Sequence, residues 1–286
     1  MGRLQQAKSR VSRWLWNAER FGVTPTKLAQ RAAVPGLPPV LSISLPKAGT
    51  HLLERALCRT PGLRRKLLPT IHDANIERWG ELGSVLKRLG PGQIAVGHLA
   101  HSHERAEAIR HHSVRAVFMI RDPRDIVISQ AHYIMSRTDH PQHRAFASAP
   151  DLASRVLIAI RGNATLDSLG TRLRAYSGWC DDDQVFTVRF EDLVGPDGGG
   201  DQARQSEALR GLYRHLGIVP SDEQMADIQA GLFAPTSPTF RHGLIGKWRE
   251  VFDETLTAAF REDADAELAA YGYDWEQGGS EGKPTK

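Results

Sequence analysis

Lys47 is the residue whose surroundings first suggest chemistry, because it lies between an apolar run and a helical pattern. Residues 40–45 (VLSISL) are short and apolar enough for a buried strand, and Pro46 and Gly49 end that run. A helix is predicted to follow, with Thr50 as its N-cap. A helix N-terminus directs backbone N–H groups and a positive dipole end at one point, and Lys47 adds a full charge there. The expected ligand is a phosphate or sulfate group.

The loop differs from the Walker A pattern of many phosphate-transferring enzymes. That pattern, GxxxxGK[ST], places its lysine after the second glycine, whereas Lys47 precedes Gly49. A nucleoside or sugar kinase would also need an acidic residue to hold magnesium. A kinase is therefore the weaker interpretation of this loop.

Three further polar residues, His98, Arg121 and Glu191, each follow a predicted strand. These strands are expected at residues 93–97, 115–120 and 184–190. Because parallel neighbours need long crossovers, strands that alternate with helices imply one α/β domain with a central parallel sheet flanked by helices. Ligands bind outside the carboxyl ends of the strands in such sheets. We therefore expect the three residues to meet Lys47 at one edge of the sheet.

The remaining elements follow from capping and periodicity. Asp122 is predicted to cap a helix that has Pro123 at its first position. Other helices are expected at residues 81–89, 102–111, 202–215 and 253–271, with helical segments around 151–178. Two irregular stretches, 61–79 with a short helix and the polar 137–150, suit the lining of a substrate cleft and a mobile gate over it.

Composition and charge fit a globular chain. It has 286 residues, of which 41% are hydrophobic and 24% charged, enough for one large domain. Residues 1–31 hold seven Lys or Arg against Glu19 alone, a net charge of +6 within an overall +4. The remainder of the chain is therefore slightly acidic, which argues against nucleic-acid binding as the main role.

The expected location is the cytoplasm. Cys58 and Cys180, the two cysteines, give neither a disulfide framework nor a metal-ligand cluster, which suits a reducing compartment. No apolar run approaches the ~20 residues that cross a bilayer, and the N-terminus lacks the apolar segment of a signal peptide.

The pattern at the N-terminus predicts a basic amphipathic helix. Its apolar stripe consists of Leu4, Ala7, Val11, Trp14, Leu15 and Ala18. We expect the helix to pack on the protein's own body with its basic face in water; the other interpretation is a peripheral membrane or partner contact of residues 1–31, anchored by Trp14 and Trp16. The chain divides into an N-terminal extension at 1–36, a folded domain at 37–275 and a disordered tail at 276–286.

Four motifs resemble segments of the sulfotransferases that use 3'-phosphoadenosine 5'-phosphosulfate (PAPS). PKAGT (46–50) resembles the PKxGTT loop for the 5'-phosphosulfate, and RDPRDIVISQAHY (121–133) carries the arginine and serine of the 3'-phosphate motif. FRHGLIGKWR (240–249) resembles the RKGxxGDWK loop, and TVRFEDL (187–193) resembles the strand-end segment Y-E-D-L. The resemblance covers about residues 40–260 and implies a P-loop NTPase-like fold.

The resemblance implies a role for each matching residue. Lys47 would neutralise the bridging and leaving oxygens of PAPS, while the loop residues Ala48, Gly49, Thr50 and His51 hold the 5'-phosphate. The implied 3'-phosphate contacts are Arg121, Ser129, Arg241, His242 and Gly243. Phe190, in place of the usual tyrosine, lies either beside the adenine or in the core. The cofactor is PAPS, its product is 3',5'-diphosphoadenosine (PAP), and no metal is called for because lysine, arginine and a helix terminus supply the charge.

The sequence departs from the family pattern at three further positions. His51 stands where the loop usually has a second threonine, which removes one hydroxyl donor. His242 and Lys247 replace a lysine and an aspartate of the last loop, which keeps its basic character.

Transfer to a hydroxyl acceptor also needs a base. His98 matches the histidine that small-molecule members of the family carry at this strand end, and the ordinary histidine pKa of ~6.5 suits that task. The competitor is a carboxylate of the first cleft loop, Asp73 or Glu77, because glycan-sulfating relatives place an acidic base there. The predicted function is a PAPS-dependent sulfotransferase acting on a hydroxyl of a small molecule, glycan or glycolipid. The alternative is a non-catalytic nucleotide-binding protein that docks through its basic helix.

Overall fold

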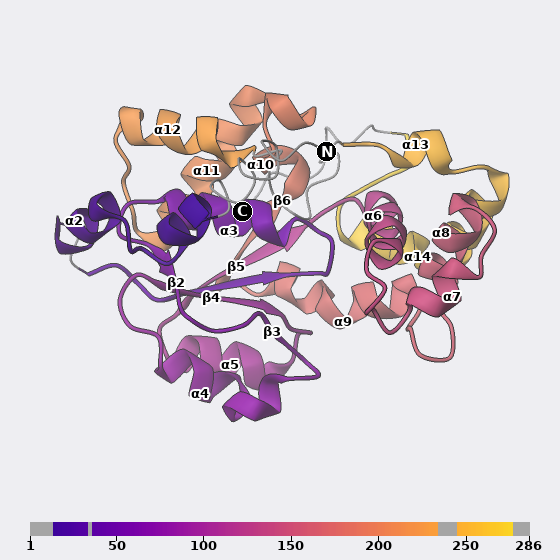
Figure 1. Ribbon diagram of the computed structural model, residues 1–286, viewed down its shortest axis with the longest axis horizontal. Helices are drawn as coiled ribbons and strands as arrows, with labels where there is room; N and C mark the ends of the chain where they lie inside the picture. The colour runs from indigo at the N-terminus through magenta and orange to yellow at the C-terminus, as the bar shows by residue number, and fades with distance from the viewer. Residues whose placement is uncertain (1–13, 34–35, 234–244, 277–286) are drawn as a thin grey trace.

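A single parallel sheet forms the centre of the molecule in a computed structural model that describes residues 14–33, 36–233 and 245–276 (Figure 1). The described strands are β1 (Val40–Ser44), β2 (Arg64–Arg65), β3 (Ile71–His72), β4 (Gln93–His98), β5 (Arg115–Ile120) and β6 (Val185–Arg189). Their order is β2-β4-β1-β5-β6, with β3 also paired to β4, and every pairing is parallel. The predicted α/β domain with a central parallel sheet is confirmed.

The central strand β1 is buried on both faces. Leu41 and Ile43 point into one hydrophobic cluster, while Val40 points into a second cluster on the other face of the sheet. This alternation is the two-residue period of a strand. Because helices cover both faces, every residue of β1 is buried, as is usual for parallel sheets.

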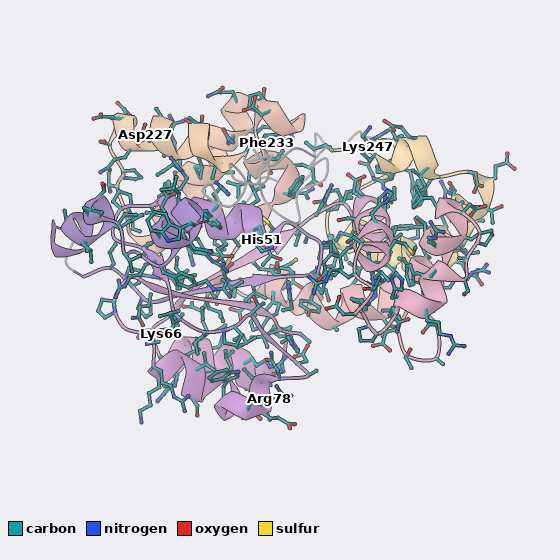
Figure 2. All side chains as sticks on the ribbon, in the orientation of Figure 1. His51, Lys66, Arg78, Asp227, Phe233 and Lys247 are labelled. Carbon is teal, nitrogen blue, oxygen red and sulfur yellow. The ribbon has the colours of Figure 1, made fainter. Side chains whose placement is uncertain are left out.

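Helices form a layer on each face of the sheet. The layer on the Val40 face contains α3 (Thr50–Arg59), α11 (Gln202–Leu216) and α12 (Asp222–Leu232), with the short α10 (Phe190–Leu193) beside α11. The opposite side contains α4 (Glu81–Lys87), α5 (His103–His111), α6 (Pro123–Met135), α8 (Leu152–Arg161), α9 (Leu169–Asp181) and α14 (Glu254–Ala270). The remaining short elements are α2 (Pro25–Ala33), η1 (Ile76–Trp79), α7 (His143–Ala147), η2 (Pro196–Gly198) and α13 (Trp248–Val251). Asp227 of α12 and Arg78 of η1 mark the two opposite sides (Figure 2).

Several predicted boundaries are wrong in detail. The stretch predicted as a loop with a short helix contains η1 but also β2 and β3, whose two residues each are too few to show a periodicity. The stretch 137–150, predicted as irregular, includes the helix α7, and α13 begins within the predicted loop 240–249. The strand predicted to end at Phe190 ends at Arg189, because Phe190 begins the helical turn α10.

The described start of the chain, residues 14–20, is helical and packs on α3. Arg20 forms an ion pair with the buried Glu54 of α3. The guanidinium of Arg55 lies 4.2 Å from the ring centroid of Trp16, which packs against the second hydrophobic cluster. The prediction that this helix packs on the protein's own body is confirmed for residues 14–20.

The face that packs is not the predicted apolar stripe. Trp14 and Leu15, which belong to the stripe, are 68% and 53% exposed. The buried carboxylate of Glu54 requires positive charge, and Arg20 supplies it, so a basic side chain points inward. The expectation that the basic face lies in water is therefore wrong for Arg20.

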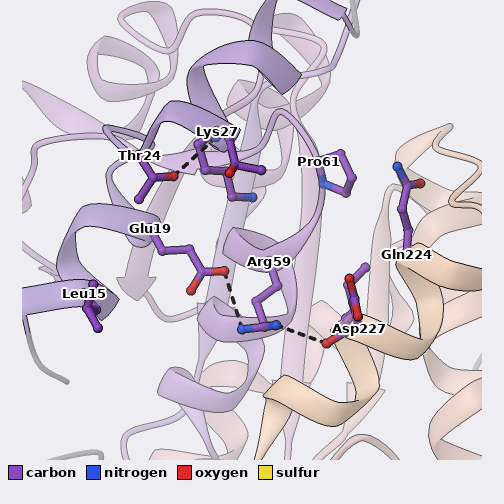
Figure 3. A pocket seen from close by; sticks show the side chains of 10 residues that line it. Leu15, Glu19, Thr24, Lys27, Arg59, Pro61, Gln224 and Asp227 are labelled. Atoms are coloured by element: carbon purple, nitrogen blue, oxygen red, sulfur yellow. Dashed lines mark hydrogen bonds and ion pairs between the residues drawn. The ribbon is translucent and has the colours of Figure 1, made fainter.

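A cavity of about 370 Å³ separates these N-terminal helices from α12 (Figure 3). At its wall, Arg59 lies 3.5 Å from Glu19 and donates a hydrogen bond of 3.1 Å to the backbone carbonyl of Asp227. Arg59 is the last residue of α3, whereas Lys47 precedes the first, so the cavity lies about one helix length from the Lys47 loop.

Candidate functional site

The loop from β1 to α3 contains two residues with left-handed backbone. Gly49 is the N-cap of α3 with a φ of 108°, and Lys47 has a φ of 73°. The prediction of Thr50 as the N-cap is wrong by one residue, because glycine reaches this conformation without steric cost. A lysine at positive φ is strained, and such strain persists mainly at functional sites.

Gly49 is required by the side chains packed against it. A Cβ atom at this position would lie 2.6 Å from the ring of Phe190 and 2.9 Å from the sulfur of Met119. Phe190 is 5% exposed, and the guanidinium of Arg121 lies 4.2 Å from its ring centroid. Phe190 is thus an interior residue that lies between the Lys47 loop and Arg121.

His98, the last residue of β4, lies beside the same loop. Its Nδ1 donates to the backbone carbonyl of Ser44 at 2.8 Å, because a carbonyl oxygen only accepts. In the neutral ring Nε2 therefore carries the lone pair. The hydroxyl of Ser44 lies 2.8 Å from that of Thr50 and 3.4 Å from Nδ1 of His98, so Ser44 joins the loop to the histidine.

The surroundings of His98 keep its ring neutral. Burial lowers the pKa of His98 below its ordinary value, the hydrogen bond to Ser44 raises it, and the nearby charges of His72, His51 and Lys47 lower it further. A neutral imidazole with a free Nε2 is the form that a general base requires.

Tyr133 of α6 contacts Lys47. The ammonium nitrogen lies 3.9 Å from the centroid of the Tyr133 ring, a cation–π distance. The ring of His140 meets Tyr133 edge-on, at 5.8 Å between centroids. The stretch 137–150, which the sequence predicts as a gate, therefore lies close to Lys47 through His140.

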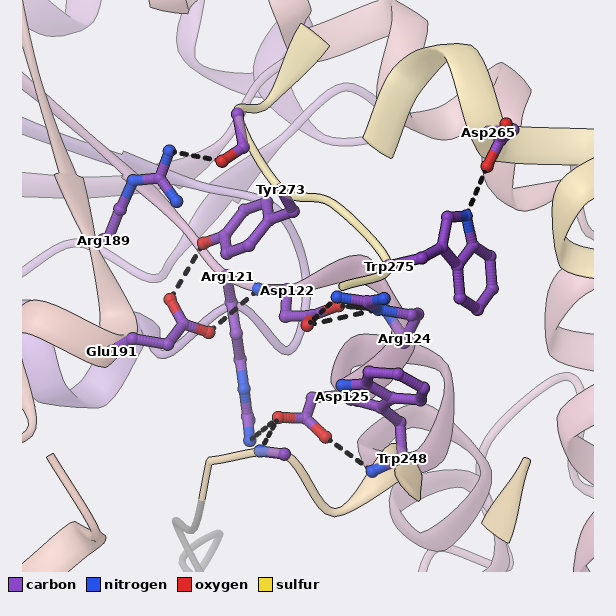
Figure 4. A network of polar contacts seen from close by, with 12 residues as sticks. Arg121, Asp122, Arg124, Asp125, Arg189, Glu191, Trp248, Asp265, Tyr273 and Trp275 are labelled. Atoms are coloured by element: carbon purple, nitrogen blue, oxygen red, sulfur yellow. Dashed lines mark hydrogen bonds and ion pairs between the residues drawn. The ribbon is translucent and has the colours of Figure 1, made fainter. Parts of the chain in front are cut away.

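The start of α6 carries a dense polar network (Figure 4). Asp122 caps the helix by accepting from the N–H of Arg124, as predicted, and also binds the guanidinium of Arg124 through both carboxylate oxygens. Arg121 lies 3.8 Å from Asp125, one turn further on. Ser129 lies about two turns into α6 and is half-buried.

Glu191 is buried next to this network. One of its oxygens accepts from the N–H of Asp122 at 3.0 Å and the other from the hydroxyl of Tyr273 at 2.8 Å. Burial raises the pKa of Glu191 to about 7, and the charge of Asp122 acts in the same direction, whereas that of Arg121 lowers it. Glu191 therefore follows its strand as predicted, but as a partner of the backbone rather than as an exposed acid.

Glu191→Gln is expected to flatten the dependence of stability on pH. The folded protein holds a proton on Glu191 up to about pH 7, and the unfolded chain releases it near its ordinary pKa of ~4.3. The free energy of unfolding that Glu191 contributes is therefore complete below the unfolded pKa and is lost as the pH rises through about 7. At pH 8 the variant, whose amide cannot ionise, should be more stable by roughly 1–3 kcal/mol.

Urea unfolding between pH 5 and pH 8 measures this slope. Glu104→Gln, at an exposed position of α5, is the control and should keep the wild-type slope. An unchanged slope in Glu191→Gln would show that Glu191 does not titrate in this range.

His51, which the sequence leaves without a role beyond the implied phosphate contact, interacts with Glu54. Its Nδ1 lies 3.6 Å from a carboxylate oxygen of Glu54, three residues further along α3. Burial alone would raise the pKa of Glu54; His51 together with the charges of Arg65 and Arg20 outweighs it and holds that pKa at about 2. Figure 2 shows His51 at the loop end of α3.

The two carboxylates that are alternatives to His98 as the base, Asp73 and Glu77, have different surroundings. Asp73 forms a 2.6 Å ion pair with Arg105 and accepts from the N–H of Ala100 at 3.2 Å. It lines a cavity of about 220 Å³ together with Leu45 and Pro46 at the start of the Lys47 loop. Glu77 is an exposed residue of η1. Asp73 therefore lies at the loop with its charge paired.

Arg241, His242 and Gly243 lie outside the described residues. Lys247, which replaces the family's aspartate, lies within them and bonds to Glu250 at 2.7 Å. Among residues 14–33, 36–233 and 245–276 there is no group of three His, Cys, Asp or Glu side chains that could hold a metal ion. Within the same ranges no helix is long and apolar enough to cross a membrane.

Three residues of the site were not predicted from the sequence. Ser44 and Tyr133 contact His98 and Lys47, and neither has a spacing or neighbour that distinguishes it in the sequence. Asp125 does have a signal, since it stands four residues after Arg121, the spacing of ion pairs on one helix face.

No protein-family model and no curated protein matches the sequence. Solved structures do have a similar fold. Mouse sulfotransferase SULT7A1 complexed with PAP has a TM-score of 0.60 at 18% identity, over 88% of this chain and 94% of that chain. Retinol dehydratase with androsterone and the inactive cofactor PAP has a TM-score of 0.55 at 15% identity, over 88% and 87% of the two chains. Retinol dehydratase with retinol and PAP has a TM-score of 0.54 at 16% identity, over 88% of both chains. With the parallel sheet and the Lys47 loop, these likenesses show that the chain has the sulfotransferase fold that its motifs resemble.

Proposed function

We propose that this protein is a sulfotransferase that moves a sulfuryl group from PAPS to a hydroxyl of an acceptor. The observation that supports the proposal is that His98 ends β4, Lys47 follows β1 and Arg121 follows β5, three neighbouring strands of one parallel sheet. Ser44 links the loop to His98, and Phe190 links it to Arg121. The PAP-bound structures of similar fold support the same donor.

The Lys47 loop fits a phosphate group. Gly49 presents bare backbone, the first N–H groups of the ten-residue α3 have no partner within their own helix, and Lys47 lies next to them. PAPS, when bound, supplies the sulfuryl group and a nucleotide that leaves with the bond's electrons. The residues that would hold its 5'-phosphate are Lys47, Ala48, Gly49, Thr50 and His51.

The 3'-phosphate is assigned to the other half of the site. Arg121 offers a planar donor fork at the end of β5, and Ser129 offers a hydroxyl two turns into the following helix. Arg241, His242 and Gly243 complete this half by the resemblance of their motif. Phe190 packs under Arg121 and holds the guanidinium at the edge of the loop.

His98 and Lys47 have different roles in the reaction. As the acceptor oxygen forms its bond to sulfur, His98 takes the hydroxyl proton on Nε2. As the bond between sulfur and the bridging oxygen breaks, Lys47 would neutralise the negative charge that gathers on that oxygen. Lysine, arginine and a helix terminus provide the positive charge for this step.

The acceptor is proposed to be a hydroxyl of a small molecule, a glycan or a glycolipid. The cavity beside Leu45 and Pro46 has a volume of about 220 Å³, which is smaller than the ~300–1,000 Å³ of typical ligand pockets. It therefore favours a compact group at the inserted end of the acceptor. Its lining combines apolar Leu169 and Tyr176 with polar Arg172.

Transfer from radiolabelled PAPS to a library of hydroxyl compounds tests the proposal, with PAP binding measured in parallel. Sulfation of at least one acceptor together with PAP binding supports it. Binding of PAP without any transfer would favour the non-catalytic alternative, and no binding of PAP would reject both.

We also propose that residues 1–31 make a peripheral contact with an anionic membrane. Four of the exposed large apolar side chains of the described residues, Trp14, Leu15, Val23 and Leu28, lie within or beside the N-terminal helices. Residues 1–13 add Arg3, Lys8, Arg10 and Arg13 without any acidic residue. Such a combination binds the interface of anionic lipids. A cytoplasmic location belongs to this proposal, and the free thiols Cys58 and Cys180 are consistent with it.

Replacing Trp14 and Leu15 by alanine together is expected to weaken vesicle binding about tenfold, because two apolar anchors are lost. Co-sedimentation with phosphatidylserine-containing vesicles measures the effect, and binding should fall as salt rises. Val219→Ala, which removes a side chain that is 96% exposed elsewhere, is the matched control. Equal sedimentation of the double variant and the wild type would reject the membrane contact.

A further inference from the structure

Asp125 connects two distant parts of the chain. It lies in the first turn of α6 and is 2% exposed. One carboxylate oxygen accepts from the N–H of Gly246 at 2.8 Å and the other from the N–H of Trp248 at 3.0 Å. Arg121 lies 3.8 Å from the oxygen that binds Gly246 (Figure 4). A single buried carboxylate thus contacts Arg121 and two backbone amides more than 120 residues further along the chain.

The segment that Asp125 holds belongs to the last predicted phosphate motif, residues 240–249. Gly246 and Trp248 match the second glycine and the tryptophan of that motif. Asp125 therefore joins the described part of this motif to Arg121.

A second contact holds the same segment in place. The ring of Trp248 lies 3.9 Å from the guanidinium of Arg124, which is fully buried. Asp122 holds that guanidinium through bonds of 2.9 and 2.8 Å. The start of α6 therefore holds the backbone of Gly246 and Trp248 and the side chain of Trp248.

The carboxylate is suited to this place in a way that an amide is not. Each of its oxygens accepts a backbone N–H, and its charge faces Arg121. An asparagine has one acceptor oxygen, so one N–H of the pair would lose its partner. A buried N–H without a partner is costly, and the segment would move to satisfy it.

We propose that Asp125 is a positioning residue for recognition of the 3'-phosphate, because it aligns residues 246–248 and Arg121 with each other. This inference rests on the proposed function, since it takes PAPS as the ligand. Asp125 itself is an acceptor of hydrogen bonds and would not contact the phosphate. Its role is to hold residues 246–248 and Arg121 at a fixed separation.

Comparison of PAP with adenosine 5'-phosphate tests the proposal, because the two ligands differ only in the 3'-phosphate. In Asp125→Asn the affinity for PAP is expected to fall about tenfold or more, whereas that for adenosine 5'-phosphate stays close to the wild-type value. Hydrogen exchange at residues 246–248 should also become faster in the variant. Asp201→Asn, which alters the exposed N-cap of α11, is the matched control.

Two results would overturn the proposal. One is an unchanged preference for PAP in Asp125→Asn; the other is an equal loss of affinity for both ligands, which indicates a general structural role. If Asp125→Asn unfolds, Asp125→Ser, which keeps one short acceptor, is measured in its place by the same criteria. A wild-type protein without any preference for PAP would instead reject the proposed function, and the role of Asp125 with it.

Discussion

Replacement of Lys47 by alanine is expected to abolish sulfuryl transfer while the fold stays intact. Lys47 is the cation at the loop that is proposed to hold the 5'-phosphosulfate, and removing one preorganised charge donor from a transfer site costs about 10²–10³-fold in turnover. The fold should tolerate the change because the side chain is only half-buried.

Lys47→Gly sharpens this test. The φ of 73° at Lys47 is strained for any residue with a Cβ atom and relaxed for glycine. The glycine variant should therefore be more stable than Lys47→Ala by about 1 kcal/mol, yet equally inactive. Such a result would show that the wild type keeps a strained lysine for its chemistry.

Turnover with PAPS and thermal unfolding of each variant provide the two measurements. Lys87→Ala, at an exposed position of α4, is the matched lysine control and should retain full activity. Activity in Lys47→Ala comparable to that of this control would reject the assignment of the loop.

Replacement of His98 by alanine is expected to lower turnover by about 10²–10⁴-fold, the contribution of a general base. The affinity for PAP should change much less, because the described hydrogen bonds of His98 go to Ser44, which joins it to the loop. Since burial lowers the pKa of His98, the wild-type rate should be level at neutral pH and fall only below the ordinary histidine range.

Parallel variants separate His98 from the carboxylates. Asp73→Ala removes the partner of Arg105 and of the Ala100 amide, so it should lower stability as well as affect the cavity. Glu77→Ala changes an exposed residue and should have little effect. His103→Ala, at a side chain that is 86% exposed, is the histidine control. If Asp73→Ala or Glu77→Ala abolishes turnover while His98→Ala remains active, the general base is that carboxylate and not His98.

The exposed stripe at Trp14 and Leu15 illustrates a limit of periodicity. The amphipathic pattern correctly predicts a helix that packs on the domain, but not which face does so. Glu54 determines which face packs, because it is buried in α3 and requires cations from two sides, Arg65 and Arg20. A pattern in one helix carries no information about a charge buried in another.

What the sequence by itself determined is local. The apolar run before Lys47, the glycine after it and the Asp122–Pro123 helix start are signals within a few residues, and the structure confirms the strand, the loop and the capped helix there. Because ligands of parallel sheets bind where strands end, the same signals also predicted the edge of the sheet at which Lys47, His98 and Arg121 lie.

Tertiary structure alone decided the contacts that join these local pieces. Phe190 packs against Gly49, and Asp125 holds the amides of Gly246 and Trp248, across 141 and more than 120 residues of sequence. Such pairs depend on which elements become neighbours when the sheet forms, and many side-chain choices are compatible with the same local pattern. A short stretch of sequence therefore predicts the chemistry of the loop, whereas the alignment of the loop with the rest of the site is determined by the folded chain.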